Sequence, residues 1–263
     1  MPEKKKTLKK KVTKKTNKKA NKKNIKTRKV IAILLFMIIL MVIIILIMFS
    51  KLFNITKITV LNNSKVSKEE IVAPSLLVEN QNMFKVSKRR IANSIKANAY
   101  IEDVKITKKF NGEVIIDVKE RVPTYMLYCE KGYAYINNQG YILEVSDVAL
   151  NLPVIKGYST KDINAGNRLE KQDLEKLDIV IQIMDTANSK QIKEIITEID
   201  ITDKNNFILS IPSEKKTVQF GDESNINVKI LWIIDIISRT KDVEGEIIVK
   251  SPDIKKAYFR EKV

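Results

Sequence analysis

The feature that most constrains this chain is an uninterrupted apolar segment close to its first residue. Residues 30–49 read VIAILLFMIILMVIIILIMF, twenty residues without a charged or polar side chain. At about 1.5 Å per residue, a helix of this length spans roughly 30 Å, the thickness of the hydrocarbon core of a bilayer. Helices of soluble proteins rarely lack a polar face altogether. Residues 30–49 are therefore predicted to form a transmembrane helix.

A cleavable signal peptide is the main alternative for this segment. Such a peptide has an apolar stretch of about 7–15 residues that ends in small residues of the A-x-A type. Here the stretch is longer and continues into Ser50-Lys51-Leu52-Phe53, which offers no such cleavage site. The sequence thus favours a retained membrane anchor.

The positive charge of the chain is concentrated ahead of the apolar segment. Residues 1–29 contain fourteen Lys, one Arg and one Glu, whereas the remainder carries 33 basic and 30 acidic side chains. Because basic residues favour the cytoplasmic side of a span, residues 1–29 are predicted to be cytoplasmic and residues 50–263 to lie outside. A tail with so little apolar surface cannot offset the entropy of ordering, so residues 1–29 are also predicted to be disordered.

The basic tail has two possible roles beyond its charge. It could bind nucleic acid, or it could fix the topology and lie against anionic lipid. No aromatic residue lies among its lysines to stack on bases. The sequence therefore favours the membrane-surface role, and no nucleic-acid partner is expected.

The composition argues against an enzyme. The chain has no histidine and a single cysteine, Cys129, which excludes Ser-His-Asp and Cys-His pairs, imidazole metal sites and an intramolecular disulfide. It also lacks a glycine-rich phosphate loop. Carboxylate pairs such as Asp117/Glu120 and Glu194/Glu198 come without the signature of a cleft, and surface charge explains them. We expect no catalytic residue, no cofactor, no metal and no small-molecule substrate.

Residues 53–121 carry the signals of a small α+β unit. The run ITKITVLNN is β-branched and ends in a turn, and Ser67 and Glu70 have the spacing of a capping box. Asn111-Gly112 between two β runs is a strong hairpin signal. The predicted order is β-α-α-β-β, a three-stranded sheet with two helices on one face. The elements after the first strand are expected to be a short helix ending near Pro74, a helix over 88–98, and strands over 101–110 and 113–120.

Residues 122–250 predict a second unit, with mixed α/β character. Apolar residues recur along one helical stripe from Leu174 to Met184, and Ser224 is expected to cap a second helix. Residues 251–263 are predicted to form a polar C-terminal tail. Strands are expected over residues 125–129, 133–136, 141–145, 194–201, 207–211, 216–220 and 246–249.

Several short motifs resemble, in order and spacing, those of the bacterial division proteins of the FtsQ/DivIB family. The first are V-x-G/N-N, N-x-F, W/Y-[IV]-x-x-[VA], N-x-[LV] and E-R-x-P; the later ones are V-D-x-x-G, L-P-x-[IL]-x-G and V-x-[LF]-G. Asn62 stands at the glycine position of the first motif, and residues 247–253 lack the family's acidic-Leu-Arg-Tyr motif. The matching positions are Val60, Asn62, Asn63, Asn82, Phe84, Tyr100, Ile101, Val104, Asn111, Val114, Glu120, Arg121 and Pro123, then residues 135–140, 152–157 and 218–221.

This resemblance covers residues 30–250 and implies both a fold and a function. The implied fold is α+β: one N-terminal transmembrane helix, a POTRA domain over residues 53–121, and an extracytoplasmic β domain over residues 122–250 that extends from the POTRA sheet. The implied function is that of a non-enzymatic, membrane-anchored scaffold of the divisome at the division septum. Its implied partners are FtsL and FtsB/DivIC-like division proteins.

The resemblance also implies where partners bind. The exposed edge of a sheet can accept a partner's strand, and the family uses this region near the last strand and the tail. We therefore expect Ile247, Val249 and Lys250 to bind partners, with Tyr258 and Phe259 as aromatic anchors. In the alternative interpretation, the two aromatic residues only fasten the tail to the domain.

Two further expectations concern the joint between the domains and the rival functions. Glu120 and Arg121, at the exit of the POTRA domain, are expected to fix the interdomain joint. An outward-facing sensor or anti-sigma-like receptor is the alternative function, but the 29-residue tail is too short and too poor in apolar residues to form a receiver-binding domain. The missing histidine and the single cysteine argue against a membrane-anchored wall enzyme.

Overall fold

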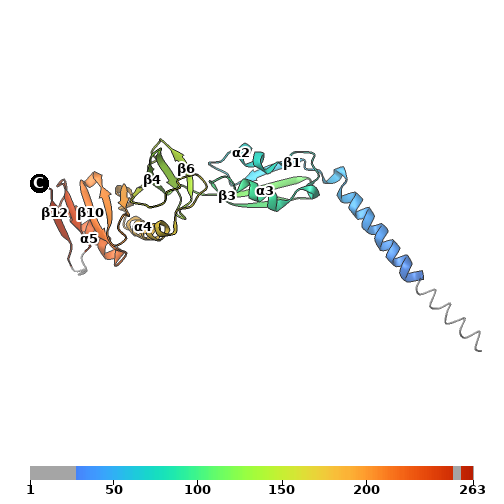
Figure 1. The fold of residues 1–263 in the computed structure, drawn as a ribbon. Coiled ribbons are helices and arrows are strands. Elements are labelled where there is room, and N and C mark those ends of the chain that lie inside the picture. Colours follow the sequence, from blue (N-terminus) through green and yellow to red (C-terminus); the bar gives the residue numbers. More distant parts are fainter. Residues whose placement is uncertain (1–27, 251–255, 263) are drawn as a thin grey trace, which may run out of the picture. The chain divides into compact units, whose positions relative to one another are not determined.

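The computed structural model describes residues 28–250 and 256–262 (Figure 1). The predicted disorder of residues 1–29 therefore lies outside the described residues, except at Arg28 and Lys29, which are helical. The chain forms two compact units. One comprises Met1–Thr59, Leu77–Ser87 and Thr107–Ile115, and the other comprises Val60–Leu76, Lys88–Ile106 and Ile116–Val263.

The apolar segment forms a single long helix, Arg28–Met48, drawn in blue in Figure 1. None of its apolar stretch is buried inside the described part of the protein, so these side chains do not pack into the protein core. The helix is long enough and apolar enough to cross a membrane. It begins two residues before the start of the predicted span and ends one residue before the end of that span.

Three strands form the smaller sheet, in the order β1 (Lys57–Leu61), β3 (Glu113–Glu120) and β2 (Ile101–Lys108). The predicted hairpin turn is present. Gly112 has φ +86°, and a Cβ at this position would come within 2.7 Å of the Asn54 carbonyl oxygen, so both the backbone conformation and the space favour glycine.

The first helices confirm the local signals in the sequence. The Glu70 N–H donates to Ser67 Oγ over 3.2 Å, and the Ser67 N–H donates to Glu70 Oε2 over 2.9 Å, which completes the predicted capping box. This hydrogen bond from the Ser67 backbone lowers the pKa of Glu70. The helical elements in this part of the chain are α2 (Lys68–Val72), η2 (Ala73–Ser75), η3 (Met83–Lys85) and α3 (Lys88–Ile95), so the predicted order β-α-α-β-β is confirmed.

The rest of the chain builds a nine-stranded sheet in the order β12-β11-β10-β9-β8-β7-β4-β5-β6. Buried side chains of α4 (Lys171–Ser189) and α5 (Ile226–Arg239) join those of the strands in one hydrophobic core. The strands are β4 (Tyr125–Cys129), β5 (Gly132–Ile136), β6 (Ile142–Ser146), β7 (Val154–Lys156), β8 (Glu198–Asp200), β9 (Phe207–Ile211), β10 (Lys216–Gly221), β11 (Gly245–Ile248) and β12 (Tyr258–Glu261).

Two local predictions in this sheet are wrong. The expected strand over residues 194–201 is shorter, because η4 (Lys193–Ile195) occupies its first residues and β8 begins only at Glu198. Ser224 does not cap α5. Its hydroxyl donates to Asp222 Oδ1, and the N-cap position belongs to Asn225, whose φ of 54° turns the chain into the helix without a side-chain hydrogen bond.

The prediction that residues 251–263 are only a polar tail is also wrong. Residues 251–255 and Val263 lie outside the described residues, but Tyr258–Glu261 forms β12, antiparallel to β11. An ion pair between Arg260 and Glu246, at 3.3 Å, joins these strands, and a second between Lys262 and Glu244, at 2.8 Å, lies just beyond their ends. Ion pairs between charged side chains therefore stabilise β12, although its sequence is as polar as that of an unstructured tail. The last strand is β12 and not β11.

Candidate functional site

Buried charged groups in the described part of the chain have structural partners. The Asp173 carboxylate, fully buried, accepts the backbone N–H of Ser159 at 2.9 Å and of Thr160 at 2.7 Å. Among the described residues, no group of three or more His, Cys, Asp or Glu side chains could hold a metal ion. The candidate functional site is a surface at one end of the nine-stranded sheet.

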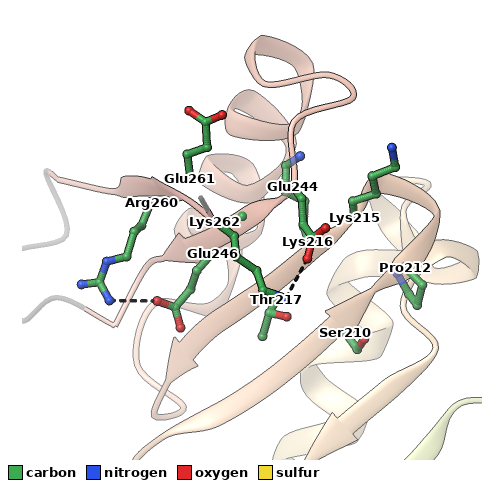
Figure 2. A pocket seen from close by; sticks show the side chains of 11 residues that line it. Ser210, Pro212, Lys215, Lys216, Thr217, Glu244, Glu246, Arg260, Glu261 and Lys262 are labelled. Atoms are coloured by element: carbon green, nitrogen blue, oxygen red, sulfur yellow. Dashed lines mark hydrogen bonds and ion pairs between the residues drawn. The ribbon is translucent and has the colours of Figure 1, made fainter.

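The C-terminal end of the nine-stranded sheet presents such a surface. Figure 2 shows β12 lying beside β11, with the Arg260 side chain directed to Glu246 and the Lys262 side chain to Glu244. The backbone N–H of Lys262 donates to the Glu244 carbonyl oxygen over 3.0 Å. These contacts set the register of the strand, with Arg260 opposite Glu246.

The register shows which backbone groups of β12 face outward. In an antiparallel pair, successive residues direct their N–H and C=O groups alternately toward the partner and away from it. Since the Lys262 N–H points to β11, those of Arg260 and Tyr258 do so as well. The backbone groups of Phe259 and Glu261 then point away from the sheet, and no described strand pairs with that side. The outer edge of β12 is open.

The structure separates the five predicted partner-binding residues into two groups. The side chains of Ile247 and Val249 are buried in the core, with exposed fractions of 0% and 5%, so they cannot touch a partner while the sheet is intact. Lys250 is exposed, and its Nζ donates to Gln219 Oε1 at 3.3 Å. Tyr258 is 52% exposed at the edge.

Phe259 packs against the core rather than projecting to solvent. Its ring is partly buried there, and Lys216 Nζ lies 5.2 Å from the ring centroid. The Lys216 ammonium is itself buried and donates to the carbonyl oxygens of Glu214 and Thr240 at 2.9 and 3.0 Å. These contacts agree with the alternative in which Phe259 fastens the C-terminal segment to the domain.

A hollow of about 660 Å³ lies beside β12 (Figure 2). Its walls carry both signs of charge, which suits a polar polypeptide more than an apolar ligand. The lining residues are Ser210, Pro212, Lys215, Lys216, Thr217, Glu244, Gly245, Glu246, Arg260, Glu261 and Lys262.

The opposite edge of the sheet is covered by the chain itself at the residue where β6 begins. The Gly166 N–H donates to the Ile142 carbonyl oxygen, and the Ile142 N–H donates to the Asn167 carbonyl oxygen, both over 2.8 Å. Just before β6, the Tyr141 ring lies 4.1 Å from the Arg121 guanidinium and 5.4 Å from that of Arg168. The backbone groups of Ile142, the first residue of β6, are therefore already paired on this edge.

The two residues predicted to form the joint have different contacts. Arg121 Nη1 donates to the carbonyl oxygens of Ala99 at 2.8 Å and Ile101 at 2.6 Å, while the guanidinium stacks on Tyr141. The Glu120 carboxylate instead accepts three backbone N–H groups of the segment between β1 and α2. Its donors are Ser64, Lys65 and Val66, at 3.1, 2.8 and 3.0 Å.

The carboxylate that meets Tyr100 is Glu144, which the sequence analysis did not identify. Glu144 Oε2 accepts the Tyr100 hydroxyl over 2.7 Å and lies 3.5 Å from Lys65 Nζ. Burial, and then this hydrogen bond, raise the pKa of Tyr100. No local signal marks Glu144, because the contact joins residues far apart in the sequence.

Comparisons with known proteins identify related sequences. Residues 53–121 match the sequence model described as a POTRA domain of the FtsQ type. The chain is 26% identical over 195 residues to the cell division protein DivIB of Clostridium tetani, which covers 73% of each chain. It is 28% identical over 189 residues to DivIB of Clostridium botulinum strain Loch Maree, covering 71% of this chain and 73% of that one.

A more distant relative carries the other family name. The chain is 27% identical over 159 residues to the cell division protein FtsQ of Syntrophotalea carbinolica, covering 59% of this chain and 55% of that protein. The domain match, the similarity across most of the chain and the single apolar helix agree with one another. The chain carries an FtsQ-type POTRA domain and is similar, over most of its length, to cell division proteins named DivIB and FtsQ.

Proposed function

We propose that this protein is a non-enzymatic, membrane-anchored scaffold of the bacterial divisome. It holds FtsL and FtsB/DivIC-like proteins outside the cell membrane, at the division septum. The main support for this proposal is the open outer edge of β12, whereas the opposite edge of the sheet is covered by the chain itself at Ile142. Similarity to cell division proteins named DivIB and FtsQ and the apolar helix Arg28–Met48 support it.

The proposed topology follows from the charge distribution. The basic residues 1–29 lie in the cytoplasm against anionic lipid, and residues 50–263 lie outside. The outer part then comprises a POTRA domain over residues 53–121 and a β domain over residues 122–250. No nucleic acid, cofactor or small-molecule substrate takes part in this function.

The proposed mode of binding is strand addition to β12. A partner segment in extended conformation forms backbone hydrogen bonds with Phe259 and Glu261, and these supply affinity. The exposed side chains of Tyr258 and Lys250 supply specificity beside it. Ile247 and Val249 contribute indirectly, because their burial holds β11 in place under β12.

The proposed joint supports this binding end. Arg121 fixes the exit of β3 against the segment that leads into β6, through its two hydrogen bonds and its stacking on Tyr141. Glu120 orders the loop over residues 64–66 beside it. We propose that these two residues hold the β domain at a defined angle to the POTRA domain.

Recovery of partners from membranes tests the proposed function. The full chain is compared with a chain that ends at Lys256 and so lacks β12, by pull-down of FtsL and FtsB/DivIC-like proteins. We expect the truncation to reduce recovery at least tenfold, about 1.4 kcal/mol in binding free energy. Val148→Ser, an exposed change after β6, is the matched control and is expected to retain full recovery. Unchanged recovery by the truncated chain would contradict the proposed site.

Depletion of the protein in cells tests the broader role. Filamentous cells without septa are expected, because a missing scaffold stops assembly of the division complex. Normal division with altered transcription would instead indicate the sensor or anti-sigma-like receptor.

A further inference from the structure

The helix Arg28–Met48 continues directly into folded structure. The Phe49 N–H donates to the Ile45 carbonyl oxygen at 3.1 Å, and the Ser50 N–H donates to that of Ile47 at 3.0 Å. The next turn, η1 (Lys51–Phe53), begins at once. Because no free linker separates the helix from this turn, the residues of η1 lie close to any bilayer that the helix crosses.

One buried side chain fastens η3 to the end of the helix. Asn82 is 8% exposed, and its Nδ2 donates to the carbonyl oxygens of Met48 at 3.1 Å and Ser50 at 3.2 Å. Its Oδ1 accepts the Phe84 N–H at 3.0 Å. The last carbonyl groups of a helix lack hydrogen-bond donors within the helix. Here the Asn82 amide is the donor for two carbonyl groups at the end of the helix. The rings of Phe53 and Phe84 pack edge to face at 5.2 Å and strengthen the same contact.

The tip of the β2–β3 hairpin is held against the same short segment. The Thr56 N–H donates to the Gly112 carbonyl oxygen at 2.8 Å. The Thr56 hydroxyl donates to the Asn111 carbonyl oxygen at 3.5 Å. These contacts place Phe110, at the hairpin tip, beside the segment that leaves the helix.

Apolar and basic side chains are exposed together around this point. The membrane-proximal patch consists of Phe49, Leu52 and Phe110, with exposed fractions of 52%, 79% and 81%, and the exposed lysines Lys51 and Lys85. Lys85 Nζ lies 6.0 Å from the Phe49 ring. Exposed Leu and Phe next to lysines are typical of segments that lie in the headgroup region of a membrane.

The charge around the patch is also positive. Beyond the helix, this unit of the chain contains five lysines and two glutamates. One of the glutamates, Glu113, is already paired, with Lys109 at 2.9 Å and Lys57 at 4.0 Å. The unit therefore offers a net positive surface to lipid phosphates.

We propose that the membrane-proximal patch docks on the outer surface of the bilayer that the helix crosses, with Phe110 and Leu52 among the lipid headgroups and Lys51 and Lys85 near anionic phosphates. The bilayer is the occupant because Phe49 and Leu52 follow the helix without a linker. The proposal rests on the membrane anchoring in the proposed function and adds a second, outer contact. This contact fixes the orientation of the first folded unit relative to the membrane.

Lipid quenching of an introduced tryptophan tests the docking. The full chain, in a Trp232→Phe background, carries either Phe110→Trp or the control Val148→Trp and is reconstituted into vesicles. The vesicles contain phosphatidylcholine alone or an equal mixture with phosphatidylglycerol, and a share of the lipid is brominated on its upper acyl carbons. Leu52→Trp provides a second reporter whose substitution leaves the hairpin untouched.

We expect the brominated lipid to quench the Phe110→Trp and Leu52→Trp reporters and to leave the control unquenched. Phosphatidylglycerol is expected to raise the docking equilibrium by about fivefold for each lysine near the surface, and Lys51→Glu with Lys85→Glu removes that gain. A Phe110→Trp reporter no more quenched than the control would overturn the proposal. Equal quenching in the two lipids would overturn its commitment to anionic lipid.

A second measurement in the same vesicles separates this proposal from the proposed function. Recovery of the FtsB/DivIC-like partner is measured alongside quenching. An unquenched reporter with full partner recovery refutes the docking alone. A quenched reporter with no partner recovery supports the docking and refutes the scaffold role.

Discussion

The two edges of the nine-stranded sheet are finished in opposite ways. At β6, backbone groups of Ile142 pair with Gly166 and Asn167. At β12, the outward backbone groups of Phe259 and Glu261 have no strand partner in the described residues. An unpaired edge is a liability that proteins usually cover. In the proposed function, the covered edge serves the chain's own architecture and the open edge of β12 receives another chain.

The side chains near the two edges repeat this difference. Near β6, Arg121 and Tyr100 contact the edge from outside the sheet and bind it to the preceding domain. At β12, the ion pairs of Arg260 with Glu246 and of Lys262 with Glu244 are made on the side of β11 and not on the outer side. Substitutions on each side therefore test the two edges separately.

The largest effect is expected for Arg121→Ala, on the β6 side. The substitution removes two charge-assisted hydrogen bonds and the stacking on Tyr141, and we expect the free energy of unfolding to fall by about 1.5–3 kcal/mol. Arg121→Lys keeps the charge but loses the planar fork, so an intermediate loss is expected. Denaturant unfolding of the full chain in detergent measures both variants. A change below about 0.5 kcal/mol, the range of ordinary surface substitutions, would show that Arg121 does not hold this joint.

A smaller effect on the same side is expected from Tyr100 and its ionisation. Tyr100→Phe removes the hydrogen bond to Glu144 and is expected to cost about 1 kcal/mol at neutral pH. Because burial and this hydrogen bond raise the pKa of Tyr100 in the folded state, its contribution is present below pH 10 and is lost as the pH rises further.

Hydrogen exchange of the Tyr100 segment, followed from about pH 9 to pH 11 and corrected for the intrinsic rate, measures this loss. The wild type is expected to lose protection over this range, and Tyr100→Phe is expected to lose less. Burial raises the pKa of Tyr125 to about 12. Tyr125 is present in both proteins and serves as the internal control. Equal alkaline losses in the two proteins would assign the effect to other groups.

The smallest effect is expected in acid, in the half of the sheet that carries β12. Hydrogen bonds from Ser224, and then from Lys229, lower the pKa of Asp222 from 3.8 to about 2. The contribution of Asp222 is therefore complete above pH 4 and is lost as the pH falls through 2. Since the Asp222 side chain is half exposed, we expect the loss to stay below about 1 kcal/mol. Asp222→Asn should flatten this acid dependence in denaturant unfolding, and an unchanged slope would refute the assignment.

Local sequence signals predicted local structure well. The capping box of Ser67 and Glu70 and the turn at Asn111-Gly112 are formed as expected, because each depends on residues a few positions apart. Ser224 shows the limit of such signals. Two residues suited to an N-cap stand side by side, and Asp222 takes the Ser224 hydroxyl, so the helix begins after Asn225.

Contacts between residues far apart in the sequence could not be predicted in the same way. Glu144 meets Tyr100 across 44 positions, and Asn82 meets Met48 across 34. The strand β12 was missed because its stability comes from pairing with β11 and from one ring, Phe259, rather than from alternating apolar residues. A Tyr-Phe pair of high β propensity after Pro252-Asp253 was the one local signal for it.

The most direct test of the central claim changes a single outward backbone group on β12. Glu261→Pro removes an N–H that points away from β11 and keeps the inward bonds of Arg260 and Lys262, since edge strands tolerate proline at such positions. Glu261→Ala removes the side chain and keeps the N–H. Titration of the full chain with the outer segment of an FtsB/DivIC-like partner compares the two variants.

If a partner strand pairs with β12, Glu261→Pro weakens binding at least tenfold, about 1.4 kcal/mol, while Glu261→Ala stays within about twofold of the wild type. Equal affinities for the two variants would contradict strand addition at this edge.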